Sequence, residues 1–206
     1  PGTKEKRGSP DRQHVYLNAD GDIICYIYRY EYADGSKEFL PWNAANGKTE
    51  FPSPRPLYRL PQLLKNNVII LVEGEKCADA LAAAGFAATT LMGGANTRIE
   101  KTDLSPLKGK DIILWPDNDE PGRKYADNVA EALLKLPVSS LKITPLTPDK
   151  PAKWDAADAV AEKFDIAGHL AKAEIYKLQE KTESSGRLKI ADFTGEMFAT
   201  EPPELQ

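Results

Sequence analysis

The feature that most constrains the fold is an alternation of short apolar runs with helix-like segments through the second half of the chain. The runs that predict strands are residues 68–72, 87–91, 111–115 and 141–146. Helices are expected at 76–84, which Gly85 ends, and at 121–135. Because strands that alternate with helices pair in parallel, this order predicts an α/β fold with a mostly parallel sheet and helices on both faces.

A domain with such a sheet is expected over residues 62–182. A short helix at 62–65 opens it, and a helical stretch at 156–181, broken near 165–168, closes it. The helix at 121–135 has the clearest pattern, with one apolar stripe. The stripe consists of Tyr125, Val129, Ala132, Leu133 and Leu136.

A small antiparallel β subdomain is expected before this domain, at residues 13–61. Strands are predicted at 15–17, 23–32 and 37–40, joined by turns that contain Asp-Gly pairs. Four prolines in 51–61 mark a connector, because proline interrupts helices and central strands. Residues 1–12 are expected to be a flexible leader, and residues 183–206 a linker or tail.

Tyrosines at positions 26, 28, 30 and 32 share one face of the strand at 23–32. Such a stripe covers a core or a domain junction more often than it stacks nucleic-acid bases. We therefore favour the role of covering a core or a domain junction.

Acidic residues follow two of the predicted strands, at the points where helices begin. Glu73 follows one strand, and Asp117 and Asp119 follow another. Ligands of open parallel sheets bind beyond the carboxyl ends of the strands, so the three carboxylates are expected to converge there. An oxygen-only site suits Mg²⁺ or Mn²⁺ and phosphate chemistry. The alternative is that these aspartates cap the helix that follows them.

Two further segments have comparable alternatives. Asp155 and Asp158 either form a third acidic corner or cap a helix in its first turn. Gly93 and Gly94 can bring backbone N–H groups close to a phosphate, with Arg98 and Lys76 adding charge, although Gly-Gly turns are common. No Walker A signature occurs in the chain.

Composition limits the classes of function without selecting one. The net charge of −4 excludes a generally basic protein that coats nucleic acid, but not a local basic groove. Cys25 and Cys77 are expected to be buried free thiols, and no zinc-ligand spacing is present, so no zinc is expected. The absence of a signal peptide and of a long apolar run indicates a soluble cytoplasmic protein.

The two acidic signatures resemble those of the Toprim domain. The resemblance covers about residues 67–165 and lies in Glu73-Gly74-Glu75-Lys76 and in Asp117-Asn118-Asp119-Glu120-Pro121-Gly122. These versions, with Trp154-Asp155-Ala156-Ala157-Asp158 after them, are most similar to phage, prophage and plasmid primase-helicases. The resemblance implies that Glu73 is a general acid/base or metal ligand and that Asp117 and Asp119 hold Mg²⁺. Cys77 departs from the familiar primase signature, which has an aspartate there.

The resemblance therefore implies a primase catalytic domain from a mobile element, which makes RNA primers on single-stranded DNA from nucleoside triphosphates. Two Mg²⁺ or Mn²⁺ ions are expected on Glu73, Asp117, Asp119 and Asp155. The expected nucleotide or DNA contacts are Arg55, Arg59, Lys76, Gly93, Gly94, Arg98, Arg123 and Lys124. A helicase in the same or a partner polypeptide is also expected. A Toprim nuclease and a non-catalytic module that binds DNA or a helicase remain alternatives.

Overall fold

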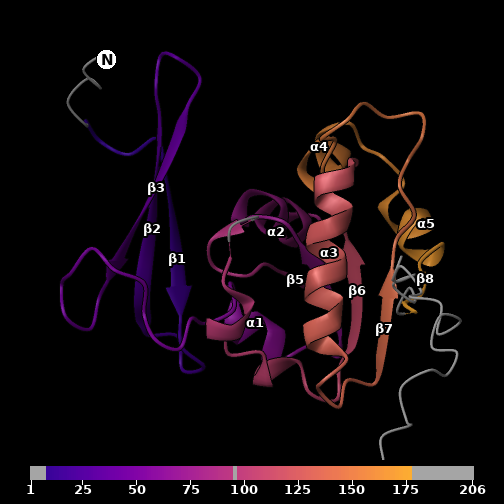
Figure 1. Ribbon diagram of the computed structural model, residues 1–206, viewed down its shortest axis with the longest axis horizontal. Helices are drawn as coiled ribbons and strands as arrows, with labels where there is room; N and C mark the ends of the chain where they lie inside the picture. The colour runs from indigo at the N-terminus through magenta and orange to yellow at the C-terminus, as the bar shows by residue number, and fades with distance from the viewer. Residues whose placement is uncertain (1–7, 95–96, 178–206) are drawn as a thin grey trace, which may run out of the picture.

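The computed structural model describes residues 8–94 and 97–177, which form a small antiparallel sheet and a larger α/β unit (Figure 1). The predicted fold class is confirmed. The expected tail at 183–206 and residues 1–7 of the expected leader lie outside the described residues, and Arg12 already belongs to the first strand.

The strands of the small sheet are β1 (Arg12–Leu17), β2 (Ile23–Glu31) and β3 (Lys37–Asn43). The larger unit begins with α1 (Leu60–Leu64), β4 (Val68–Val72), α2 (Glu75–Ala83) and β5 (Ala88–Thr89). It continues with β6 (Asp111–Trp115), α3 (Glu120–Leu133), β7 (Ser140–Ile143), α4 (Ala156–Ala161), α5 (Ile166–Ala171) and β8 (Glu174–Ile175).

The strand order of the larger sheet places two of the acidic turns side by side. The order is β5-β4-β6-β7-β8, with only β8 antiparallel to its neighbour. Strands β4 and β6 are parallel neighbours, and their last residues, Val72 and Trp115, are in register. Because parallel strands end at the same edge of the sheet, the turns that follow β4 and β6 lie next to each other.

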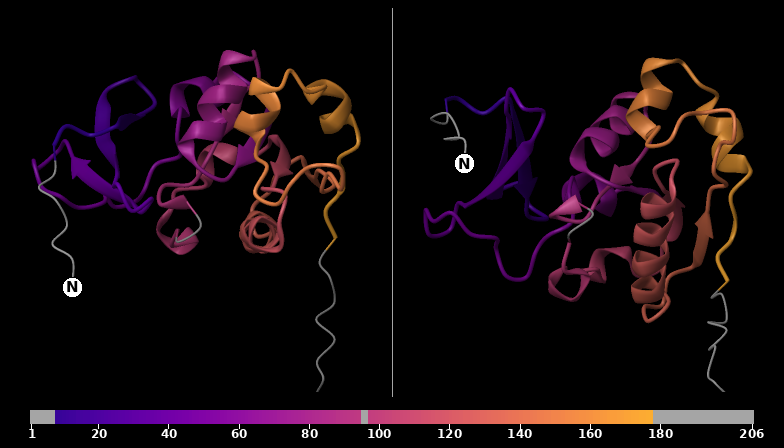
Figure 2. Two further views of the ribbon diagram at one scale, coloured as in Figure 1. Left: turned by 90° about the horizontal axis from the view of Figure 1, so that it is seen from above. Right: turned by 45° about the horizontal axis from the view of Figure 1, so that its top comes forward.

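Side chains of this sheet alternate between two cores. Ile69 and Leu71 of β4 pack in the core beneath α3, whereas Ile70 and Val72 pack in the core that contains α2 and α4. Figure 2 shows α3 and α2 on opposite sides of the sheet. The predicted helix α3 and most of its apolar stripe are confirmed, since Tyr125, Val129 and Leu133 are buried.

The small sheet packs against the α2 side of the larger unit through one face. Cys25 and Ile27 of β2 and Tyr16 of β1 belong to the same core as α2. The tyrosine positions alternate with these, and Tyr26 and Tyr28 stack on each other with ring centroids 5.9 Å apart. The favoured role of the tyrosine stripe, to cover a core or a domain junction, is therefore wrong: the face with Cys25 and Ile27 packs in the core and forms the junction.

Helix α2 is held to the small sheet and the connector by polar bonds to Asp79. Its carboxylate accepts hydrogen bonds from Tyr58 Oη (3.1 Å) and Arg59 Nη1 (2.8 Å). His14 Nδ1 of β1 lies 3.4 Å from the same carboxylate. These contacts join β1, the proline-rich connector and α2 at one point.

The expected helical stretch at 156–181 is only partly correct. Asp165 accepts a hydrogen bond from Gly168 N (2.9 Å) and so caps a new helix, α5, at the predicted break. Residues 174–175 then pair with β7 as the antiparallel edge strand β8, and Ile175 lies opposite Lys142. Residues 174–175 form a strand and not a helix because they pair with the edge of β7. Residues 178–181 lie outside the described part of the chain.

Among the described residues no helix is long and apolar enough to cross a membrane. Both cysteines, Cys25 and Cys77, are buried free thiols, as expected.

Candidate active site

Glu73 lies in the turn between β4 and α2, and glycine at position 74 permits that turn. Gly74 is the N-cap of α2 and has a φ of 90°, a backbone conformation that residues other than glycine rarely adopt. Its N–H donates to Thr90 Oγ1 (2.9 Å), at the end of the neighbouring strand β5. The turn that carries Glu73 is therefore held from two strands.

Asp117 and Asp119 lie in the turn between β6 and α3. Asp119 is the N-cap of α3 and accepts a hydrogen bond from Gly122 N (2.8 Å), so the capping interpretation is correct for one of its oxygens. A Cβ at Gly122 would lie 2.6 Å from the carbonyl oxygen of Asp117 and 2.9 Å from its Cβ. Only glycine lets the first turn of α3 lie this close to Asp117.

The carboxylates of the two turns repel one another. Burial, followed by the charges of Glu73, Asp155 and Asp119, raises the pKa of Asp117 to about 7. Burial and the charge of Asp119 also raise the pKa of Glu73 above its ordinary value. Glu73 and Asp117 have no side-chain hydrogen bond or ion pair with any other described residue. Two partly buried acids are thus left without a hydrogen bond or an ion pair, and their pKa values are raised, which is typical of functional sites.

Asp155 stands at the same edge of the sheet but has partners. It is the N-cap of α4, and its carboxylate lies 3.1 Å from Lys76 Nζ of helix α2. Lys76 Nζ is also 3.6 Å from Asp158 Oδ1. Both aspartates therefore have the capping role that the sequence allowed, together with an ion pair to α2.

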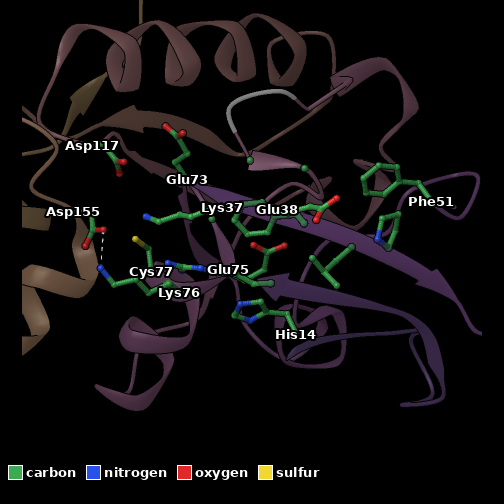
Figure 3. A pocket seen from close by; sticks show the side chains of 17 residues that line it. His14, Lys37, Glu38, Phe51, Glu73, Glu75, Lys76, Cys77, Asp117 and Asp155 are labelled. Atoms are coloured by element: carbon green, nitrogen blue, oxygen red, sulfur yellow. Dashed lines mark hydrogen bonds and ion pairs between the residues drawn. The ribbon is translucent and has the colours of Figure 1, made fainter. Parts of the chain in front are cut away.

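A cavity of about 680 Å³ opens between the acidic turns and the small sheet. Figure 3 shows Glu73, Asp117 and Asp155 around it, with residues of the small sheet opposite. The side of the larger unit is formed by Glu73, Gly74, Glu75, Lys76, Cys77, Gly93, Gly94, Asp117 and Asp155. The side of the small sheet and connector is formed by His14, Ile27, Arg29, Lys37, Glu38, Phe39, Pro41 and Phe51.

The structure separates the expected nucleotide and DNA contacts into two groups. Lys76, Gly93 and Gly94 line the cavity. The others do not line it: Arg55, Arg59, Arg98, Arg123 and Lys124.

Three of these arginines have other partners. Arg55 is buried, its guanidinium 3.9 Å from the ring centre of Phe51 and its Nη1 3.3 Å from the Met92 carbonyl oxygen. Arg59 pairs with Asp79, and Arg123 pairs with Asp127 one helical turn away. These contacts give the three arginine side chains a structural role in the fold.

The basic and aromatic residues on the opposite wall were missed by the sequence interpretation. Arg29 and Phe39 are opposite each other in the β2–β3 register, and the guanidinium lies 6.0 Å from the Phe39 ring centre. Lys37 lies one period-2 step from Phe39 and also lines the cavity. This alternation was visible in the sequence, but nothing in it indicated which face of the small sheet would meet the acidic turns.

Glu75 was also missed. It is buried at the start of α2, lines the cavity and accepts a hydrogen bond from Tyr16 Oη of β1 (2.7 Å). In the sequence it stands just before the predicted helix at 76–84, a position that gave no sign of burial.

The chemistry of the donors fits a hard divalent cation. Among the described residues no three acidic, histidine or cysteine side chains are already arranged to hold a metal ion. Glu73 and Asp117 nevertheless offer unpartnered oxygens whose mutual repulsion a cation would relieve, and Asp119 has one oxygen outside its cap. These are the residues that would hold Mg²⁺ or Mn²⁺.

Comparison with known proteins gives one family match that covers the two acidic turns. The family model described as "Toprim domain" matches residues 68–146, which include Glu73, Asp117 and Asp119. Toprim domains generally bind divalent metal ions. No curated protein matches the chain.

Several solved structures have a similar fold. The E. coli primase catalytic core superposes with a TM-score of 0.58 at 20% identity, over 79% of this chain and 52% of that one. A DNA primase domain from Pseudomonas aeruginosa gives 0.61 at 22% identity, over 79% of this chain and 51% of that one.

A third similar structure is that of bacteriophage T7 lagging-strand DNA polymerase interacting with primase domains of two gp4 subunits. It gives a TM-score of 0.54 at 20% identity, over 80% of this chain and 78% of that one. This chain spans about half the length of the two bacterial primase structures. Residues 68–146 therefore match the Toprim domain model, within a chain whose fold resembles those of primase catalytic cores.

Proposed function

We propose that this chain is the catalytic part of a DNA primase from a mobile-element replication protein, and that it makes RNA primers on single-stranded DNA. One observation carries the proposal: two unpartnered carboxylates, Glu73 and Asp117, face a basic and aromatic wall across one cavity. The resemblance of the two acidic signatures and of the segment 154–158 supports the phage, prophage and plasmid context.

Each wall has the chemistry that nucleotidyl transfer requires. In that reaction a primer 3′-hydroxyl attacks the α-phosphorus of a nucleotide, the bond to pyrophosphate breaks, and the hydroxyl proton leaves. Mg²⁺ or Mn²⁺ held by Glu73, Asp117 and Asp119 would neutralise the phosphate charge and activate the attacking oxygen. Glu73, whose pKa is raised, either takes the hydroxyl proton or serves as a ligand.

The opposite wall would bind the substrates. Lys37 can pair with phosphates, Arg29 can do so if it leaves its ion pair with Glu31, and Phe39, which is 49% exposed, offers a ring for a base to stack on. Gly93 and Gly94 line the same cavity and leave room for a phosphate close to the backbone. Arg98 and Lys124 remain candidate contacts for DNA that extends beyond the cavity.

The similar structures are consistent with such ligands. One DnaG primase catalytic domain with this fold is bound to single-stranded DNA. The T7 primase domains are bound to an RNA/DNA hybrid and dTTP. For this chain we propose the same ligand classes, and a helicase in the same or a partner polypeptide.

A priming assay tests the proposal. The full chain is incubated with single-stranded template, labelled nucleoside triphosphates and Mg²⁺ or Mn²⁺, and the products are separated on a gel. We expect new oligonucleotides, reduced about 100-fold or more in Asp117→Asn, because loss of a ligand should cost at least as much as loss of a residue that supports one. Asp149→Asn makes the same chemical change on an exposed loop and should prime normally.

The other outcomes separate the alternatives. Shortened template that also depends on Asp117 would favour a Toprim nuclease, which uses the same carboxylates to activate water. Retention of template with neither product would favour a non-catalytic module that binds DNA. Either result would overturn the primase proposal.

A further inference from the structure

The acidic corner at the start of α4 is closed by its own hydrogen bonds. Asp155 Oδ1 accepts from Asp158 N (2.9 Å), and Asp158 Oδ2 accepts from Asp155 N (3.2 Å), so the two residues form a reciprocal capping box. One oxygen of each carboxylate is thus committed to the backbone of α4.

Lys76 occupies the two oxygens that remain. Its ammonium lies 3.1 Å from Asp155 Oδ2 and 3.6 Å from Asp158 Oδ1. Lys76 lies at the start of α2, in the same four-residue signature as Glu73. Its side chain therefore extends from the first acidic signature to the corner formed by Asp155 and Asp158. Figure 3 shows the bond between Lys76 and Asp155 beside Asp117. All four oxygens of the corner therefore have a partner.

A divalent ion at this corner would have to displace the ammonium group or lie beside it. The first breaks an ion pair in which the Asp155 side chain is only 16% exposed, and the second places two cations together. Glu73 and Asp117 carry no such bond, so an ion that binds there displaces nothing. The charge of Lys76 also reaches Asp117, where it lowers the pKa against the stronger effects that raise it.

From this contrast we propose that Lys76 is a built-in cation that takes the place of a second metal ion. The cavity then holds one Mg²⁺ or Mn²⁺, on Glu73, Asp117 and Asp119, and Asp155 positions Lys76 instead of binding metal. This inference rests on the proposed metal-dependent function, and it replaces the sequence-based expectation of two ions with one.

Binding of Mn²⁺ to the full chain, followed by electron paramagnetic resonance in the absence of substrate, tests the number of ions. We expect one ion for the wild type, two for Lys76→Gln, which frees both aspartates, and one for Lys76→Arg, which keeps the charge. Lys135→Ala removes an exposed lysine at the far end of α3 and should leave one ion. Two ions in the wild type, or one in Lys76→Gln, would overturn the inference and leave the proposed function intact.

Single substitutions of the aspartates test the same assignment without any change at Lys76. Asp155→Asn keeps a residue suited to the N-cap and should change Mn²⁺ affinity by less than about threefold, whereas Asp117→Asn should lower it about tenfold or more. A tenfold loss in Asp155→Asn would show that Asp155 is a ligand and would overturn the inference. No Mn²⁺ binding by the wild type would instead remove the metal-dependent function on which the inference rests.

Discussion

The two acidic corners of the cavity are made of the same residue types at the same edge of the sheet, yet they differ in how their charges are compensated. At one corner, Asp155 and Asp158 are bonded to each other's backbone and to Lys76. At the other, Glu73 and Asp117 have no hydrogen bond or ion pair from the rest of the described chain, and their pKa values are raised.

From this difference we infer a structural role for Asp155 and Asp158 and a functional role for Glu73 and Asp117. A paired carboxylate can be explained by the stability of the fold, because its partner offsets the cost of burial. An unpartnered and partly buried carboxylate destabilises the fold unless it binds something else. Sequence position alone could not distinguish the two corners, since both follow a predicted strand and precede a predicted helix.

The largest expected effect on stability and activity comes from a substitution that displaces Asp117, one of the two unpartnered carboxylates. In Gly122→Ala the new Cβ would lie 2.6 Å from the Asp117 carbonyl oxygen, so either α3 or the Asp117 turn must shift. We expect the free energy of unfolding to fall by about 1–3 kcal/mol, as for overpacked sites, and priming to be lost. Urea denaturation and the priming assay measure the two effects.

The control for this substitution is Asn128→Ala, which places alanine on the exposed face of the same helix. It should leave priming unchanged. Gly122→Ala with wild-type stability and activity would show that Asp117 does not depend on the close approach of α3.

The pH dependence of stability sharpens the comparison. The pKa of Asp117 is raised from 3.8 to about 7, so between these values the folded protein holds a proton that the unfolded chain has released. Stability from this group is therefore fully present below about pH 4 and is lost as pH rises through 7. After allowance for partial exposure to solvent, we expect a loss of about 1–2 kcal/mol at pH 8.

Urea denaturation of the metal-free wild type and of Asp117→Asn at pH 5 and pH 8 measures this effect. The difference in stability between the two proteins should grow with pH in favour of the variant, and Mg²⁺ at pH 8 should stabilise the wild type more. A constant difference across this range would mean that Asp117 is not strained by its neighbours.

Another carboxylate that lines the cavity offers the smallest test. Glu75 is buried and has one protein donor, Tyr16 Oη at 2.7 Å, so it belongs with the compensated acids. Tyr16→Phe removes that donor and should lower the free energy of unfolding by about 1 kcal/mol or somewhat more. Denaturation by urea measures the change.

The matched variant is Glu75→Gln, whose amide oxygen can still accept the bond from Tyr16. It should cost less than Tyr16→Phe, and the double variant should show that the two effects are not additive. Additive effects would contradict a direct coupling between β1 and α2.

Much of the fold could be predicted because hydrophobic patterning is local. The apolar runs at 68–72 and 111–115 and the stripe of α3 specify strands and a helix through their own periodicity. The strand β8 could not be predicted in this way, because residues 174–175 are a strand only where the edge of β7 is available to pair.

The sequence by itself determined the chemistry of the candidate site: Glu73, Asp117 and Asp119 lie in turns that follow buried strands and offer only oxygen donors. Tertiary structure decided which of the acids are compensated and what faces them. Lys76 reaches Asp155 across 79 residues, and Arg29 and Phe39 reach the cavity only because the Cys25 and Ile27 face of the small sheet packs on α2. These outcomes depend on contacts between distant segments, which local propensity does not encode.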